Sequence, residues 1–161
     1  MIRVYAKRCP FSSYAQLHRA AYELLYFVLL RDFPFAEEDL VLCKTEAGKP
    51  YFRDVPICFS ISHTEGLVVV AVGNTQLGVD AEKADRILKK GIGARFLHKE
   101  EADISDWVMY ESVGKMQGCG IPYDPSEIHD AYFCKIYRDV AGYVVCCAGY
   151  DNMFPEHIEL I

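Results

Sequence analysis

Three acidic residues and one lysine have the types and spacing needed to hold a metal ion. Asp80 and Glu82 are two residues apart in the stretch Gly-Val-Asp-Ala-Glu. On a β-strand they point to the same face, where two carboxylates repel each other unless a cation or a shared proton lies between them. If the segment from Trp107 to Lys115 is helical, Glu111 and Lys115 share a face at i,i+4 spacing. Together these groups suit a hard divalent cation on a polyphosphate, whereas Asp-x-Glu alone is equally typical of a solvated strand end.

The composition describes a folded, acidic protein. At 161 residues, with 52% hydrophobic and 13% aromatic residues, the chain is long enough for one domain, or for two small halves that share a core. Its formal net charge of −6 argues against general nucleic-acid binding, which favours a basic surface.

The sequence also predicts a cytoplasmic protein with reduced cysteines. No apolar run approaches the length of a membrane span, and Glu23 interrupts residues 20–30. The first seven residues alternate like a strand and lack the apolar region of a signal peptide. The seven cysteines are odd in number and form no Cys-x-x-Cys pair, so neither a disulfide framework nor a zinc site is expected.

The clearest predicted element is a helix in the first third of the chain. Ser12 or Ser13 can cap its start, and Pro34 lies just past its end. Arg19 lies beside its apolar stripe and can reach a cleft, although the pattern alone favours a surface arginine with a packed stem. The stripe has helical spacing and contains Leu17, Ala20, Ala21, Leu24, Leu25, Val28 and Leu29.

A second long helix is expected over residues 99–117, with Gly118 as its C-terminal stop. Gly114 inside this helix costs about 1 kcal/mol relative to alanine. Strands are expected at residues 39–43, 57–62, 66–72, 77–82, 131–137, 142–150 and 157–160.

This order predicts an α+β fold made of two similar halves, residues 1–82 and 83–161, each with a long helix packed on a small antiparallel sheet. Asp80 and Glu82 of the first half would then face Glu111 of the second half across a cleft.

Positive charge is concentrated at the start of the second predicted half, from Lys83 to Lys99. It is either a solvated surface or a face that receives an acidic partner. The residues are Lys83, Arg86, Lys89, Lys90, Arg95 and Lys99.

Ser62 and His63 are adjacent in a short polar turn. Neighbouring residues on an extended chain point apart, and no Gly-x-Ser-x-Gly elbow surrounds them. A serine hydrolase is therefore excluded.

Five segments, in order and spacing, resemble the 4′-phosphopantetheinyl transferases of the larger, surfactin-synthetase-activating type. They are Gly-Lys-Pro at 48–50, Phe-Ser-Ile-Ser-His-Thr at 59–64, Gly-Val-Asp-Ala-Glu at 78–82, Arg-Phe-Leu at 95–97, and Trp-x-x-x-Glu-Ser-x-x-Lys at 107–115. The resemblance implies a pseudo-dimer of two α+β halves with the active site between them. It implies an enzyme, a holo-carrier-protein synthase, that moves the phosphopantetheine arm of coenzyme A to a serine of an acyl or peptidyl carrier protein and releases 3′,5′-ADP.

The resemblance also implies roles for the acidic residues. Asp80, Glu82 and Glu111 would hold Mg²⁺ against the coenzyme A diphosphate, and Lys115 would lie beside the attacked phosphate. Either Glu111 or a metal-bound water would take the serine proton. Both halves lie in one chain, so a monomer is expected to be active.

Five further residues are expected to contact coenzyme A by the same resemblance. Ser62 and His63 would contact the 3′-phosphate, Lys49 would help to hold the nucleotide, and Arg19 aligns with an arginine on the family's first helix. Tyr110 departs from the family, because a lysine usually precedes the helical glutamate, so a phosphate-binding charge is lost there.

Two alternatives remain open. A degenerate member of the family would bind coenzyme A or a carrier protein without transfer. A Mg²⁺-dependent phosphohydrolase would use the acid cluster but would not need the Ser-His and Gly-Lys-Pro segments.

Overall fold

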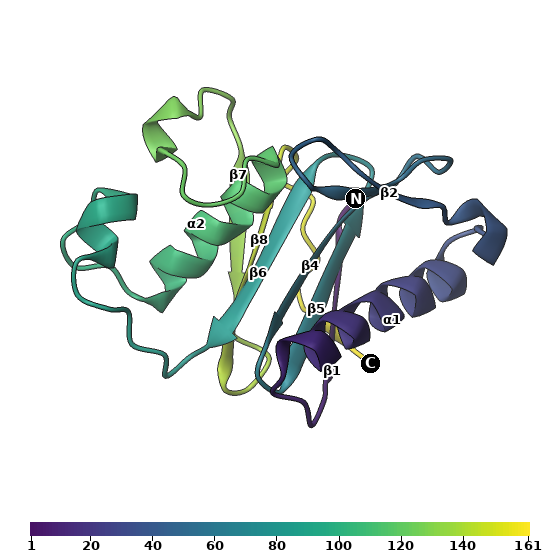
Figure 1. Ribbon diagram of the computed structural model, residues 1–161, viewed down its shortest axis with the longest axis horizontal. Helices are drawn as coiled ribbons and strands as arrows, with labels where there is room; N and C mark the ends of the chain where they lie inside the picture. Colours follow the sequence, from purple (N-terminus) through teal and green to yellow (C-terminus); the bar gives the residue numbers. More distant parts are fainter.

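The computed structural model describes residues 1–161 and has the expected α+β composition. Helix α1 (Tyr14–Asp32) and helix α2 (Ile104–Gln117) lie on opposite sides of the molecule, and two small sheets lie between them (Figure 1). Each helix therefore covers the outer face of one sheet.

The first sheet has the strand order β4-β5-β1-β9. Its strands are β1 (Arg3–Arg8), β4 (Cys58–Thr64), β5 (Leu67–Gly73) and β9 (Glu159–Leu160). All pairs are antiparallel except β1–β9. Every residue of β5 is buried, because its two alternating sets of apolar side chains pack on both faces of the sheet: one set against α1 and the other against the second sheet.

The second sheet has the order β6-β8-β7 and is antiparallel. Its strands are β6 (Leu77–Lys83), β7 (Phe133–Tyr137) and β8 (Tyr143–Gly149). All of strand β6 except Lys83 falls within residues 1–82, yet β6 pairs along its whole length with β8, whose residues come 60 to 72 positions later in the chain. The second sheet therefore contains strands from both sides of residue 82. The division of the chain into two halves stays a prediction.

Helix α1 matches its sequence pattern closely. Ser13 is the N-cap and accepts a hydrogen bond from the Gln16 amide, and the helix ends before Pro34. All seven residues of the predicted stripe are buried against the first sheet. No helix of the structure has both the length and the apolar character required to cross a lipid bilayer.

The predicted start of α2 was wrong by one turn. The helix begins at Ile104 rather than at residue 99, because Asp103 accepts hydrogen bonds from the Ser105 and Asp106 amides while the Asp106 carboxylate accepts from the Asp103 amide. This reciprocal capping fixes the first turn. The predicted stop at Gly118 is confirmed, since this residue has a left-handed conformation with φ 77°.

Several shorter elements complete the chain. Strands β2 (Leu42–Lys44) and β3 (Pro50–Phe52) form a separate hairpin, and the expected strand at 39–43 was misplaced because Glu37–Asp39 form a short helical turn. Two more short helical segments lie at Gly93–Leu97 and Pro125–Glu127.

The two sheets meet where β4 passes the unpaired edge of β6. The Val79 amide donates to Ser60 Oγ at 3.0 Å, and the Ala81 amide donates to Ser62 Oγ at 3.1 Å. Both serines are buried. Buried amide groups without a partner are costly, so these two hydroxyls replace the missing strand.

Helix α2 lies very close to β6 at Gly78. A Cβ atom at this position would overlap the carbonyl oxygen of Ser112 and meet the amide nitrogen of Met116. Both are backbone atoms of the helix and cannot rotate away. Glycine at this position is therefore required for α2 to pack on β6.

We predict that Gly78→Ala destabilises the protein by about 3 kcal/mol, the upper part of the range for overpacking a core, because the helix must move away from the strand. The matched control is Gly149→Ala, whose Cβ would meet only the end of the Ile2 side chain at 2.9 Å. The control should lose about 1 kcal/mol. Chemical denaturation would measure both, and equal losses would contradict the proposed helix–strand constraint.

Candidate active site

The three predicted acidic residues lie together. Asp80 and Glu82 project from β6 toward α2, and Glu111 projects from α2 toward β6. One carboxylate oxygen of each residue lies within 4.8 Å of the others. The cluster arises because Gly78 brings the helix close and the next two residues on the same face of the strand are acidic.

Asp80 is the most buried of the three acids, with 3% of its surface exposed. Its Oδ1 atom accepts two hydrogen bonds, one from Ser62 Oγ at 2.9 Å and one from Lys115 Nζ at 2.7 Å. Its Oδ2 atom is buried and has no hydrogen-bond partner. A buried carboxylate oxygen without a partner is rare and requires an explanation.

The other two carboxylates are partly buried and carry raised pKa values. Burial, followed by the charge of Asp80, raises the pKa of Glu111 from its ordinary value of 4.5 to about 7. Burial also raises the pKa of Glu82, and the ion pair with Arg86 opposes this effect. Burial and the neighbouring Asp80 charge therefore both disfavour the ionised form of Glu111, and a bound cation would favour it.

Lys115 lies beside the acids, as predicted. Its ammonium group donates to Asp80 Oδ1 and to the Val79 carbonyl oxygen at 3.1 Å. An ammonium has three N–H donors, so one remains for another acceptor. The side chain is 33% exposed and lines the cavity that opens over the acids.

This cavity has a volume of about 380 Å³ and contains all three acids, Ser62, His63 and Lys115 in its walls. Its opposite wall was not predicted from the sequence. It is formed by Tyr14, His18 and Tyr22 of α1 and Lys44 of β2. The only sequence signal for the helix residues was their position beside the apolar stripe.

Three aromatic rings belong to that wall, those of Tyr14, His18 and Tyr22, and the ring of His63 contacts those of Tyr14 and His18. The Tyr14 and His18 rings are stacked, with centroids 5.5 Å apart and an interplanar angle of 12°. His63 meets both rings edge-on, at 4.9 Å from Tyr14 and 5.8 Å from His18. Burial, followed by His18 and Lys115, lowers the pKa of His63, so an anion is needed to stabilise its charged form.

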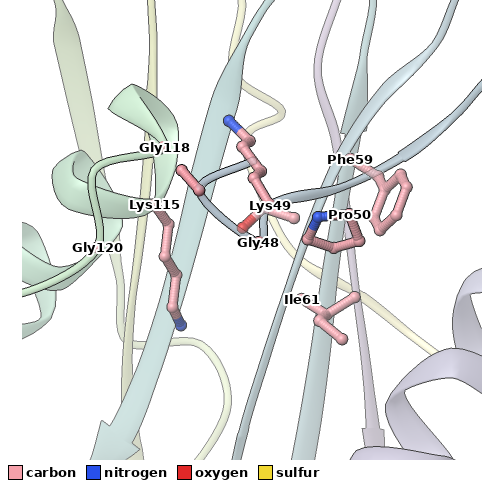
Figure 2. A pocket seen from close by; sticks show the side chains of 10 residues that line it. Gly48, Lys49, Pro50, Phe59, Ile61, Lys115, Gly118 and Gly120 are labelled. Atoms are coloured by element: carbon pink, nitrogen blue, oxygen red, sulfur yellow. The ribbon is translucent and has the colours of Figure 1, made fainter. Parts of the chain in front are cut away.

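A second cavity of about 260 Å³ shares Gly48, Pro50, Ile61 and Lys115 with the first (Figure 2). Lys49 lines it, but its Nζ atom donates to the Met116 carbonyl at the end of α2, at 2.8 Å. The ammonium groups of Lys49 and Lys115 point in opposite directions (Figure 2). Burial lowers the pKa of Lys49. Through its hydrogen bond to Met116, Lys49 stabilises the C-terminal end of α2, where the free carbonyl groups attract a cation.

Arg19 is not brought to the cavity. It pairs with Glu23 on the outer side of α1, and 82% of its side chain is exposed. The expectation that Arg19 contacts the ligand is corrected here, because one residue along a helix is a rotation of about 100° and His18 occupies the inward position.

Tyr110 also points away from both cavities. It is buried and stacks on Tyr123 with ring centroids 4.3 Å apart. Its hydroxyl donates to the Tyr123 carbonyl at 2.7 Å and accepts from the Tyr123 amide at 2.8 Å. The expectation of a phosphate contact is therefore wrong for this structure: Tyr110 attaches the loop after α2 to the helix.

The donor set fits a hard divalent cation. Three carboxylates offer oxygen ligands within 4.8 Å of one another, and the buried, unpartnered Asp80 Oδ2 adds an oxygen that has no other use. Mg²⁺ prefers such oxygen ligands together with waters and substrate phosphates. Asp80, Glu82 and Glu111 are the residues that would hold it.

Comparisons with known proteins give one partial match. No protein-family model matches the chain. The chain is 34% identical over 100 residues to the 4′-phosphopantetheinyl transferase gsp of Aneurinibacillus migulanus. The alignment covers 59% of the chain and 41% of that protein, so the matched region spans less than half of the relative's length.

We predict that Glu111→Gln raises the melting temperature of the metal-free protein at pH 8. The pKa of about 7 exceeds the ordinary value of 4.5, so the unfolded chain loses its proton first as the pH rises. The wild-type free energy of unfolding therefore falls from about pH 4.5 and levels off above pH 7. Glutamine does not titrate and avoids this loss.

Thermal denaturation of both proteins between pH 5 and 8 in a chelator would measure the effect, with Glu100→Gln as a control at an exposed glutamate outside the cluster. Mg²⁺ should raise the wild-type melting temperature at pH 8. If the melting temperatures of the wild-type and Glu111→Gln proteins change with pH in parallel, the titration of Glu111 does not affect stability and the prediction is wrong.

Proposed function

We propose that this chain belongs to the 4′-phosphopantetheinyl transferase superfamily and transfers the phosphopantetheine arm of coenzyme A to a serine of a carrier protein, a proposal supported by its similarity to one such transferase. The observation that carries the proposal is the cluster of Asp80, Glu82 and Glu111 beside Lys115 in the wall of an open cavity. Within this superfamily, we further propose that the two helix-on-sheet layers form the pseudo-dimer.

The chemistry needs the charge that these residues can supply. The serine oxygen forms a bond to the phosphorus nearer the pantetheine, the bond from that phosphorus to the bridging oxygen breaks, and 3′,5′-ADP leaves. Negative phosphate oxygens repel the incoming oxygen. Mg²⁺, held by the three carboxylates, supplies the positive charge that reduces this repulsion.

Lys115 and Glu111 have separate proposed roles. The free N–H of Lys115 binds an oxygen of the attacked phosphate, while its other two bonds keep the ammonium in place. Glu111 takes the proton of the serine hydroxyl. The position of its carboxylate in the wall of the open cavity, beside Lys115, supports this role.

We propose that the aromatic wall of the cavity contacts the nucleotide. The stacked rings of Tyr14 and His18 offer a flat surface to a base. His63 and Lys44 line the same cavity and offer positive charge to a phosphate. Lys49 would act indirectly, by fixing the end of α2.

All proposed site residues come from one chain, so we propose that the monomer is active.

The carrier protein would dock on the segment between β6 and α2. Lys89 and Lys90 make no ion pair there, and Ile87 is 90% exposed. Basic groups around an exposed apolar side chain suit an acidic partner. Which carrier protein is served, that of fatty-acid, polyketide or peptide synthesis, is a question for the assay.

The test is to incubate the protein with coenzyme A, Mg²⁺ and an apo carrier protein, and to follow the intact mass of the carrier. We expect the mass to increase by one phosphopantetheine arm. Asp80→Ala and Glu111→Ala should remove transfer, with a loss of at least about 100-fold, while the fold is kept. Near wild-type loading by either variant would contradict the metal assignment.

The same assay separates the alternatives. A degenerate protein would bind coenzyme A without loading any carrier. A phosphohydrolase would release 3′,5′-ADP without a carrier present. Repeating the assay across dilution, alongside light scattering, tests the monomer, because activity per chain that falls as a dimer dissociates would contradict it.

We predict that His18→Ala raises the KM for coenzyme A about tenfold, because it removes one ring of the stacked surface and an imidazole beside His63. The matched control is Arg19→Ala, which changes the next residue on the outer side of the helix and should leave the KM unchanged. Steady-state kinetics would measure both KM values. A larger increase for Arg19→Ala than for His18→Ala would show that Arg19, and not His18, contacts coenzyme A.

A further inference from the structure

We infer that Ser62 is a positioning residue for the cation site, which selects the oxygen of Asp80 that binds the metal. The resemblance assigned Ser62 to a phosphate of the ligand. The contacts of its hydroxyl group point to a different role. This inference rests on the proposed function only in that a divalent cation binds at the three carboxylates.

The first step of the argument is the hydrogen-bond capacity of Ser62. Its hydroxyl accepts from the Ala81 amide at 3.1 Å and donates to Asp80 Oδ1 at 2.9 Å. A serine hydroxyl has a single hydrogen, so that donor is already used. With 5% of the residue exposed, the hydroxyl has little freedom to turn toward a ligand.

The second step concerns the two oxygens of Asp80. Oδ1 accepts from both Ser62 and Lys115, at 2.9 and 2.7 Å. Oδ2 accepts from no group and is buried. The two donors therefore hold the carboxylate in one rotation, with Oδ1 toward the protein and Oδ2 left as the available ligand atom.

The third step is that Ser62 ties this rotation to the backbone. The amide that anchors the hydroxyl belongs to Ala81, the residue next to Asp80. The side chain of Asp80 is thus fixed relative to its own strand, not only by the mobile end of Lys115. Hydrogen bonds of this kind to a ligating carboxylate orient it and raise metal affinity.

Strand β4 supplies a matched control two residues away. Ser60 is also buried and accepts from the Val79 amide at 3.0 Å, but it makes no bond to any acid of the cluster. Ser60→Ala and Ser62→Ala each remove one hydroxyl from the contact between β4 and β6. Only Ser62→Ala removes a donor from Asp80.

The test uses Mn²⁺ alone as the probe, titrated into the full-length protein without coenzyme A and followed by electron paramagnetic resonance, with Mg²⁺ as competitor. We expect Ser62→Ala to weaken Mn²⁺ binding about tenfold or more, and Ser60→Ala to change it less than about twofold. The melting temperature should fall in both variants, because each loses one buried hydrogen bond to a β6 amide, and it should fall further in Ser62→Ala, which also loses the bond to Asp80.

Two results would overturn the inference: unchanged Mn²⁺ affinity in Ser62→Ala, or equal weakening by both substitutions, which would indicate general loosening of the strand contact. If Ser62→Ala does not fold, Ser62→Cys keeps the shape but donates weakly, and the same loss of affinity is expected. Because the titration contains no carrier and no coenzyme A, its outcome is independent of whether transfer is observed. Wild-type protein that binds no Mn²⁺ would overturn the cation site itself.

Discussion

The unpaired edge of β6 is the constraint on which the arrangement of the molecule depends. Two of its amides face the first sheet with no strand beside them, and the hydroxyls of Ser60 and Ser62 accept from them. Because a buried amide without a partner costs about 1 to 3 kcal/mol, these bonds hold β4 in one register against β6. The apolar cluster between the sheets, which includes Val69 and Val79, adds affinity between the layers but does not specify a register. The polar contact therefore places α1 and its aromatic residues opposite the acids.

The acidic site is electrostatically incomplete by itself. Lys115 and Arg86 oppose the charge of three carboxylates, but burial, followed by the charge of Asp80, still raises the pKa of Glu111. The protein keeps this unfavourable arrangement because α2 and β6 are held together by packing that does not involve the acids, through Val108, Val113 and their neighbours against β8. Stability of the fold and readiness for a cation are thus supplied by different residues.

The sequence predicted what depends on local spacing. The stripe of α1, the stop at Gly118, and the two pairs Asp80/Glu82 and Glu111/Lys115 each follow from the period of a strand or a helix. That the two pairs meet was implied by the family resemblance and not by local spacing. It did not predict what depends on distant partners. The pairing of β6 with β8 joins segments far apart in the chain, and the two faces of α1 that carry His18 and Arg19 differ by a single residue. Tyr110 was misassigned because its partner, Tyr123, lies in a loop with no regular pattern. The N-cap of α2, Asp103, lies four residues after the expected start of the helix at residue 99, and its capping pattern with Asp106 was overlooked.

The close approach of β6 and α2 at Gly78 can be used in protein design. A Cβ at Gly78 would collide with the α2 backbone, so a bare strand backbone at this one position sets how closely the helix can approach. Acids placed two and four residues further along the strand then project past the crossing point, where a glutamate of the helix can meet them. A scaffold with the same crossing, a glycine at the point of contact and acids at the next two positions on that face would hold three carboxylates without any loop. The backbone would then set where the three acidic side chains begin, and hydrogen bonds such as those of Ser62 and Lys115 to Asp80 would set their rotation. The β6–α2 pair with these two donors is a compact unit to transfer into another α+β framework.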